Sequence, residues 1–120
     1  MTRHDDAARL WHMLDNARRA SRLASGRGRS DLDADELFNL AMTRLLEVIG
    51  EAAARVSPAT REQCPNLPWQ SIAGMRNRLI HGYDQVDFNV LWDVVQYDLP
   101  GLIDEMEKIL AEFPGDQAGP

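Results

Sequence analysis

Apolar residues recur every three or four positions between Leu37 and Val56, and this periodicity constrains the fold more than any other feature. One stripe consists of Leu37, Leu40, Ala41, Leu45, Val48, Ile49, Ala52 and Val56, and a second consists of Phe38, Met42 and Leu46. A period of 3.6 residues predicts an α-helix, and Asp33 followed by Glu36 is typical of its start. Because this apolar face is wider than one neighbouring helix covers, we expect a central helix that also contributes to a dimer interface.

Further helices are predicted on both sides of this segment. A first helix over residues 5–24 ends where Gly26 and Gly28 break the pattern. Three prolines make residues 58–68 a turn-rich connector with room for one helical turn. The next helix runs from Pro68-Trp69 to His81, with Gly82 as the residue just past its end. Asp87 caps a last helical stretch, which ends at Pro114-Gly115. Pro100 either kinks it or divides it into two helices, the second capped by Asp98.

No stretch alternates polar and apolar residues with the period of two that strands require. The 120 residues suffice for one domain with its own core. We expect an all-α bundle of four to five helices over residues 1–113 and a disordered tail at 114–120. One cysteine, Cys64, excludes an internal disulfide and a cysteine-based zinc site. An acidic N-terminus and the lack of an apolar run of about 20 residues predict a cytoplasmic protein without a membrane span.

Charge is distributed unevenly along the chain, whose net charge is −6. Residues 1–30 hold seven arginines and three acids, whereas residues 84–120 hold one lysine and nine acids. An acidic protein is a poor general binder of nucleic acid, because affinity for phosphates depends on basic side chains. Nearly all basic residues are arginines, which suit bidentate phosphate contacts. A compositional bias of the genome explains this excess equally well.

Five polar side chains that can carry chemistry fall close together: Arg76, Asn77, Arg78, His81 and Tyr83. Cleavage of RNA without a metal requires a base for the 2′-hydroxyl, an acid for the leaving oxygen and a cation for the crowded phosphorane. Histidine titrates near neutral pH and can serve as acid or base, and arginine can hold two phosphate oxygens. The segment is therefore a candidate nuclease site.

Helical spacing determines which of these side chains meet if the helix extends to His81. Asn77 and Arg78 precede His81 by four and three residues and neighbour it on the helix surface. Arg76 precedes it by five residues and lies about 140° away. Arg76 therefore reaches the histidine by its length, by a local distortion, or by approaching the His81 of a second copy. The spacing favours a composite site in a dimer without establishing it.

A structural interpretation accounts for the same residues. A histidine in the last turn of a helix interacts favourably with the helix dipole. Arg76 and Arg78 can pair with surface acids, and Tyr83 can pack on the body of the domain. From the residues alone, both interpretations stay open.

Other residues with reactive or aromatic side chains favour structural roles. Glu51 could orient the Arg/His cluster, but it also suits a surface or inter-helix ion pair. His4 and His12 lack a third partner for a metal ion. The tryptophans could stack on bases, although helix packing is the commoner role. Cys64 has no neighbouring base and is expected to be an incidental thiol.

The motif Arg76-x-x-x-x-His81-x-Tyr83 and the blocks around it are similar to a known superfamily. The motif resembles the signature of the HEPN superfamily, in its HepT-like branch. Residues 45–52 resemble the central helix of that family, residues 69–77 resemble the approach to its motif, and residues 84–102 resemble the segment after the motif. The likeness covers residues 5–112.

This resemblance implies an all-α homodimer, with higher order left open, and metal-independent endoribonuclease activity without a cofactor. It further implies the toxin of a toxin–antitoxin pair, whose partner is a minimal nucleotidyltransferase antitoxin that adds AMP to the motif tyrosine. By position in the motif, Arg76 and His81 would be catalytic, Asn77 and Arg78 supporting, and Tyr83 the AMPylation target. The rival interpretation is a non-catalytic helical module that docks a nucleotidyltransferase or a nucleotide, because a fold does not guarantee an active site.

Overall fold

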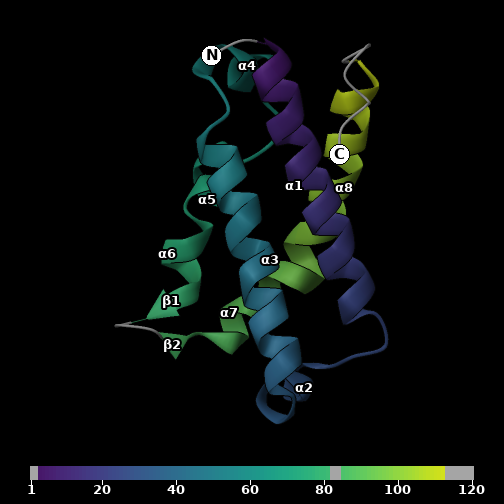
Figure 1. Ribbon diagram of the computed structural model, residues 1–120, viewed down its shortest axis with the longest axis vertical. Helices are drawn as coiled ribbons and strands as arrows, with labels where there is room; N and C mark the ends of the chain where they lie inside the picture. The colour runs from purple at the N-terminus through teal and green to yellow at the C-terminus, as the bar shows by residue number, and fades with distance from the viewer. Residues whose placement is uncertain (1–2, 82–84, 113–120) are drawn as a thin grey trace.

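The computed structural model describes residues 3–81 and 85–112, without the side chains of Arg3, His4 and His81. Within these ranges the regular secondary structure is helical apart from one short hairpin (Figure 1), so the all-α class is confirmed. The predicted tail at 114–120 and the predicted helix end at Pro114-Gly115 lie outside the described residues. No helix in the described ranges combines the length and hydropathy needed to cross a membrane.

The central position belongs to α3, with α1 against one side and α5 and α6 against the other (Figure 1). α8 packs along α1. The helices are α1 (Arg3–Ala24), α2 (Arg29–Ala34), α3 (Glu36–Ala54), α4 (Pro58–Gln63), α5 (Trp69–Ala73), α6 (Met75–Leu79), α7 (Phe88–Asp93), the π-helix η1 (Val94–Asp98) and α8 (Leu99–Ala111). The strands β1 (Ile80–His81) and β2 (Gln85–Val86) pair antiparallel, with Ile80 opposite Val86.

The buried face of α3 combines the second predicted stripe with part of the first, because Ile49 and Ala52 of the first stripe are also buried. Phe38, Met42 and Leu46 are almost fully buried in the core, together with Ile49. Leu37 and Leu40, which belong to the first stripe, are 81% and 59% exposed. The prediction of a central helix is confirmed, but its start is wrong: Asp35, not Asp33, caps α3 by accepting the backbone N–H of Phe38.

The segment before α3 contains a helix that the sequence did not predict. Gly26 turns the chain after α1 with a positive φ of 76°, which glycine adopts without a steric penalty. α2 then begins at Arg29, so the break predicted at Gly26 and Gly28 extends over residues 25–28. Asp33, predicted as the cap of the central helix, instead pairs with Arg29 at 2.9 Å.

The helix predicted from Pro68 to His81 is divided and shorter than expected. Gly74 separates α5 from α6, and α6 ends at Leu79. Ile80 has an extended backbone, with φ −98° and ψ 124°, and the N–H of Asp87 donates to the carbonyl of Leu79 at 2.7 Å. Pairing with β2 thus replaces the last helical turn, and the predicted helix end at His81 is wrong; Gly82, the predicted terminator, lies outside the described residues.

The chain passes Pro100 without a break. Asp87 caps α7 as predicted, accepting the N–H groups of Asn89 and Val90. The N–H of Leu99 donates to the carbonyl of Val94, five residues earlier. This π-type bond lets Pro100, which has no N–H to donate, sit in the first turn of α8. The helical segment is therefore continuous through Pro100, and the alternative of a second helix capped by Asp98 is wrong, because Asp98 makes no side-chain cap.

The close approach of α3 to the junction of α5 and α6 depends on Gly50. A Cβ atom at this position would lie 2.9 Å from the carbonyl oxygen of Ile72 and 2.9 Å from the Cβ of Met75. Both distances are far inside van der Waals contact. Glycine therefore allows the segment that carries Arg76 to pack directly on α3.

A buried carboxylate joins the start of α1 to the start of α4. Asp6, which is 1% exposed, accepts hydrogen bonds from the N–H and Oγ of Ser57, at 3.0 and 2.6 Å, and from Oγ1 of Thr60, at 2.6 Å. Burial by itself raises the pKa of Asp6, but these hydrogen bonds and the charge of Arg9 outweigh it and lower the pKa. The ionised form is therefore the stable one in the folded protein.

Replacing Asp6 should destabilise the protein in a pH-dependent way. The lowered pKa means that Asp6 adds stability above its unfolded pKa of about 4, and that this stability is lost as the pH falls through the folded pKa. Asp6→Asn should lower the free energy of unfolding by about 2 kcal/mol at pH 7, and the deficit should shrink below pH ~4. Urea unfolding at several pH values tests this, with exposed Asp33→Asn as control. A deficit independent of pH would contradict it.

Adding one methyl group at Gly50 should separate α5 and α6 from α3. Gly50→Ala is expected to lower the free energy of unfolding by about 1–3 kcal/mol, as overpacking of a tight core does. Gly101→Ala is the matched control, because a Cβ atom at that helical position meets open space. It should be neutral or stabilise the protein by up to about 1 kcal/mol. Equal stability of the two variants in urea unfolding would show that Gly50 is not a contact point.

Candidate functional site

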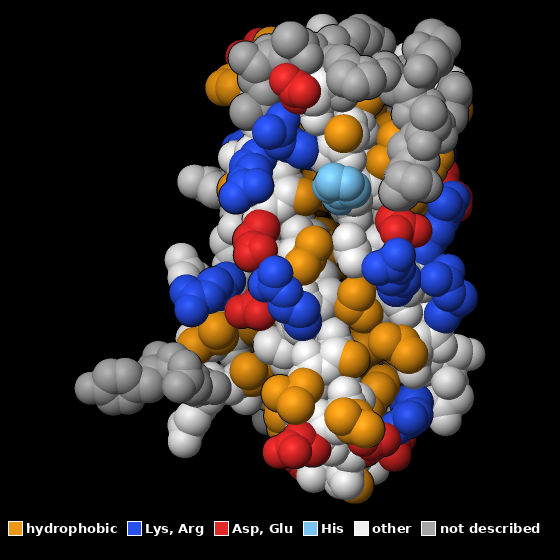
Figure 2. Space-filling model, viewed as in Figure 1, with side chains coloured by type: hydrophobic (Ala, Val, Ile, Leu, Met, Phe, Trp, Pro, Cys, Tyr) orange, Lys and Arg blue, Asp and Glu red, His pale blue; other side chains and the backbone are white. Residues whose placement is uncertain are grey.

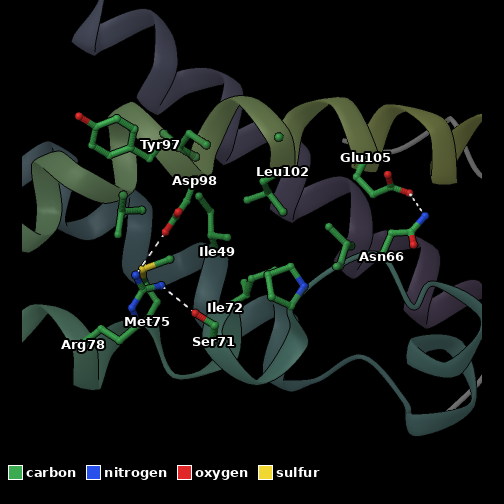
Figure 3. A pocket seen from close by; sticks show the side chains of 15 residues that line it. Ile49, Asn66, Ser71, Ile72, Met75, Arg78, Tyr97, Asp98, Leu102 and Glu105 are labelled. Atoms are coloured by element: carbon green, nitrogen blue, oxygen red, sulfur yellow. Dashed lines mark hydrogen bonds and ion pairs between the residues drawn. The ribbon is translucent and has the colours of Figure 1, made fainter.

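The two arginines of the predicted site point to opposite sides of α6. Arg76 is 65% exposed, and its Nε lies 3.6 Å from a carboxylate oxygen of Glu47 on α3. Arg78 turns toward η1, where its Nη2 lies 3.2 Å from Asp98 and its Nη1 donates to Oγ of Ser71 at 2.9 Å (Figure 3). Two residues correspond to about 200° of helix rotation, which separates the two guanidinium groups.

The remaining predicted site residues are Asn77, His81 and Tyr83. Asn77 is exposed on α6. His81 belongs to β1 through its backbone and pairs with Gln85, whereas its side chain and the whole of Tyr83 lie outside the described residues. Because residues 80 and 81 are extended, the helical angles that relate Asn77, Arg78 and Arg76 to His81 do not apply. Helical spacing therefore gives no geometric support for a composite site.

Glu47 is a site residue that the sequence interpretation missed. Its side chain is 17% exposed and contacts Arg76, the motif arginine that faces α3. Glu51, the acid considered from the sequence, instead pairs with Arg44 at 3.5 Å. The pair of Glu47 and Arg76 joins two helices, so no regular interval in the sequence predicts it. The available hint was the position of Glu47 within the family-like block 45–52.

Several of the N-terminal arginines pair with acids within the molecule. Arg27 pairs with Asp35 at 3.1 Å and stacks on Phe38, and Arg29 pairs with Asp33. Arg18 pairs with Glu107 of the acidic C-terminal segment at 2.7 Å. The charge gradient along the sequence is thus partly cancelled in space. Arg76 differs from these residues because it is mostly exposed and contacts its acid at a longer distance.

Residues considered for metal binding or nucleophilic chemistry have structural surroundings. Within residues 3–81 and 85–112, excluding undescribed side chains, no group of His, Cys, Asp and Glu is arranged to hold a metal ion. Burial raises the pKa of the Cys64 thiol, and the nearby charges of Glu105 and Glu112 add to this effect. The indole N–H of Trp69 donates to the Cys64 carbonyl, so this tryptophan packs in the core as predicted.

One face of the molecule combines charged and apolar regions. Figure 2 shows hydrophobic side chains gathered over the C-terminal end of α1 and the N-terminal half of α3, with charged side chains and a histidine above them. Leu23 is 45% exposed, in addition to Leu37 and Leu40. A hollow of about 540 Å³ is lined by Leu23, Ala41, Leu45 and three arginines. Exposed apolar patches of this kind mark contact sites.

Comparison with known proteins identifies the family. The family described as "Ribonuclease HepT-like" matches residues 13–109. A Methanocaldococcus jannaschii protein named "putative RNase" is 39% identical over 88 residues, which cover 69% of this chain and 76% of that protein. A second protein of that name from the same organism is 33% identical over 109 residues, covering 91% of this chain and all of that protein.

A third relative carries the name of the family itself. The "probable ribonuclease HepT" of Thermococcus cleftensis is 39% identical over 79 residues, covering 66% of this chain and 72% of that protein. No solved structure gave a significant match. The family match spans α3, α6 and the hairpin, including every residue of the motif from Arg76 to Tyr83. The resemblance seen in the sequence is confirmed, and the chain belongs to the HepT-like ribonuclease family.

Proposed function

We propose that the chain is an endoribonuclease that cleaves RNA without a metal ion. The observation that carries this proposal is the presentation of Arg76. Its side chain is 65% exposed and is steadied by Glu47, on a short helix that leads directly into the strand containing His81. In a chain of the HepT-like ribonuclease family, this arrangement offers a guanidinium group to a phosphate, and the sequence has a histidine five residues later.

The chemistry uses the 2′-hydroxyl of the substrate as the nucleophile. His81 accepts the proton of the 2′-hydroxyl, and the 2′-oxygen attacks the adjacent phosphorus. The bond from phosphorus to the 5′-oxygen then breaks, and a protonated imidazole supplies the proton to that oxygen. Arg76 stabilises the negative charge on the oxygens around phosphorus through its several N–H donors. The products are a 2′,3′-cyclic phosphate and a 5′-hydroxyl.

A homodimer would supply a second copy of each catalytic group. The exposed side chains of Leu23, Leu37 and Leu40 support self-association, because a two-fold dimer joins the same patch of both copies. Glu47 follows Leu40 by seven residues, which is about two turns along the same side of α3. Its partner Arg76 would therefore lie beside the interface. In such a dimer, two histidines could share the acid and base roles.

The family relationship also supports a regulatory partner. We include in the proposal that the protein is the toxin of a toxin–antitoxin pair and that a nucleotidyltransferase antitoxin adenylylates Tyr83. In this step the tyrosine oxygen attacks the α-phosphorus of ATP and pyrophosphate leaves. The added phosphate would bring negative charge within two residues of His81 and compete with RNA for Arg76.

Removing either proposed catalytic side chain should abolish most of the activity. His81→Ala and Arg76→Ala are each expected to slow cleavage of a fluorescent RNA in EDTA by about 100-fold or more. His12→Ala, which removes an exposed histidine of α1, is the control and should cleave at the wild-type rate. If wild-type protein leaves the RNA intact, the rival non-catalytic docking module is favoured. Full activity of the Arg76 or His81 variant would contradict the assigned roles.

Introducing charge into the apolar face should prevent dimer formation. The double variant Leu37→Arg/Leu40→Arg is expected to elute as a monomer in light-scattering measurements, because it places two charges at the interface centre. Tyr97→Arg is the matched control, since Tyr97 is 78% exposed on η1, outside this face. It should retain the wild-type mass. A monomeric wild type, or a dimeric double variant, would contradict the proposed interface.

The two tyrosines of the chain allow a direct test of the modification site. Tyr83→Phe should cleave RNA like the wild type but gain no mass when incubated with ATP and the nucleotidyltransferase. Tyr97→Phe should still be modified and silenced. Intact-mass spectrometry before and after incubation measures both outcomes. Modification of the Tyr83→Phe variant would show that another residue is the target.

A further inference from the structure

Arg78 bridges three helical segments of the chain. Its guanidinium group, carried by α6, donates to Ser71 of α5 at 2.9 Å and contacts Asp98 of η1 at 3.2 Å. Figure 3 shows both contacts at one end of a cavity. The side chain is 36% exposed, so part of its donor capacity is already used by protein groups.

The cavity explains why such a bridge matters for α6. A space of about 520 Å³ separates α5 and α6 from η1 and α8. Its lining includes Ile49, Ile72, Met75 and Leu102, and a hydrogen bond of 3.4 Å from Asn66 to Glu105 crosses its far end. Close packing does not fill the gap between α6 and η1. The contacts of Arg78 therefore supply a fixed link across it.

α6 is too short to hold its own orientation. It contains five residues, far fewer than the roughly 12 that make an isolated helix marginally stable. Met75 and Leu79 are buried and anchor one side. Gly74 precedes the helix, and the extended residue Ile80 follows it. A small rotation of α6 about its axis would move the exposed guanidinium group of Arg76 away from Glu47.

We propose that Arg78 is a positioning residue, which fixes the rotation of α6 through Asp98 and Ser71 and thereby aims Arg76 at the scissile phosphate. This inference rests on the proposed function, in which Arg76 stabilises the transition state. Asp98, the last residue of the π-helix, has the same positioning role, because it holds the guanidinium group of Arg78. The bridge is partly exposed, and exposed ion pairs add little to overall stability. Its loss therefore affects catalysis more than folding.

The competing assignment is direct contact between Arg78 and RNA. The two assignments predict different effects of replacing Asp98. If Arg78 binds RNA, Asp98→Asn frees its guanidinium group, and activity is unchanged or rises. If Arg78 positions α6, Asp98→Asn removes the same link as Arg78→Gln. Both variants then impair the same step, and their effects do not add.

Steady-state kinetics on a defined RNA separates these outcomes. Arg78→Gln and Asp98→Asn should each lower kcat by about 10- to 100-fold, as a misplaced catalytic group does, with KM changed less than about twofold. The double variant should be no slower than Arg78→Gln, and the exchanged pair Arg78→Asp/Asp98→Arg should recover activity. Arg18→Gln and Glu107→Gln break an ion pair of similar exposure and should leave kcat unchanged. Full activity of Asp98→Asn beside an impaired Arg78→Gln would overturn the proposal.

Hydrogen exchange tests the bridge without relying on cleavage. Amides of residues 75–81 should exchange faster in Arg78→Gln and in Asp98→Asn than in the wild type, while those of α1 and α3 and the melting temperature stay the same. Unchanged exchange in α6 would show that the bridge does not hold this helix. If wild-type protein does not cleave RNA, the proposed function fails, whereas faster exchange in both variants would still establish the link from Arg78 to α6.

Discussion

The contact of α3 with the α5–α6 junction at Gly50 is the constraint on which the rest of the site depends. Because Gly50 has no side chain, the carbonyl of Ile72 and the Cβ of Met75 occupy space that a Cβ atom would need. This approach brings Arg76 within ion-pair distance of Glu47. The same junction leaves a cavity on the other side of α6, which Arg78 spans. The contact at Gly50 thus influences the position of the exposed Arg76 and of Arg78, which pairs with Asp98.

Apolar periodicity was sufficient to predict the class of the fold and its longest elements. α1 and α3 form where helices were predicted, and Asp87 caps α7 as expected. Periodicity could not decide which residues of α3 face the core, because both stripes are apolar. Tertiary packing decides this, and it leaves Leu37 and Leu40 exposed. Short elements such as α2 and the hairpin were not predicted, because they depend on tertiary contacts that the sequence pattern does not show.

The motif identified the candidate site, but spacing gave its geometry incorrectly. The angles assumed a helix up to His81, whereas pairing of Ile80 with Val86 ends that helix at Leu79. Residue types alone made Arg76 and Arg78 equivalent. Their surroundings differ, because Arg76 contacts Glu47 and Arg78 contacts Asp98, and neither contact is visible as a sequence interval. The charge gradient was real, yet pairs such as Arg18–Glu107 partly cancel it in the folded protein.

In the proposed mechanism, Arg76 and His81 assist attack by the 2′-hydroxyl of the RNA itself. The chemical ends of the RNA fragments test this claim most directly, because they record which oxygen attacked phosphorus. Mass spectrometry of a synthetic RNA cleaved by the wild-type protein in EDTA should find 2′,3′-cyclic phosphate and 5′-hydroxyl ends. Intact RNA, or fragments with 3′-hydroxyl and 5′-phosphate ends produced by attack of water, would contradict this mechanism.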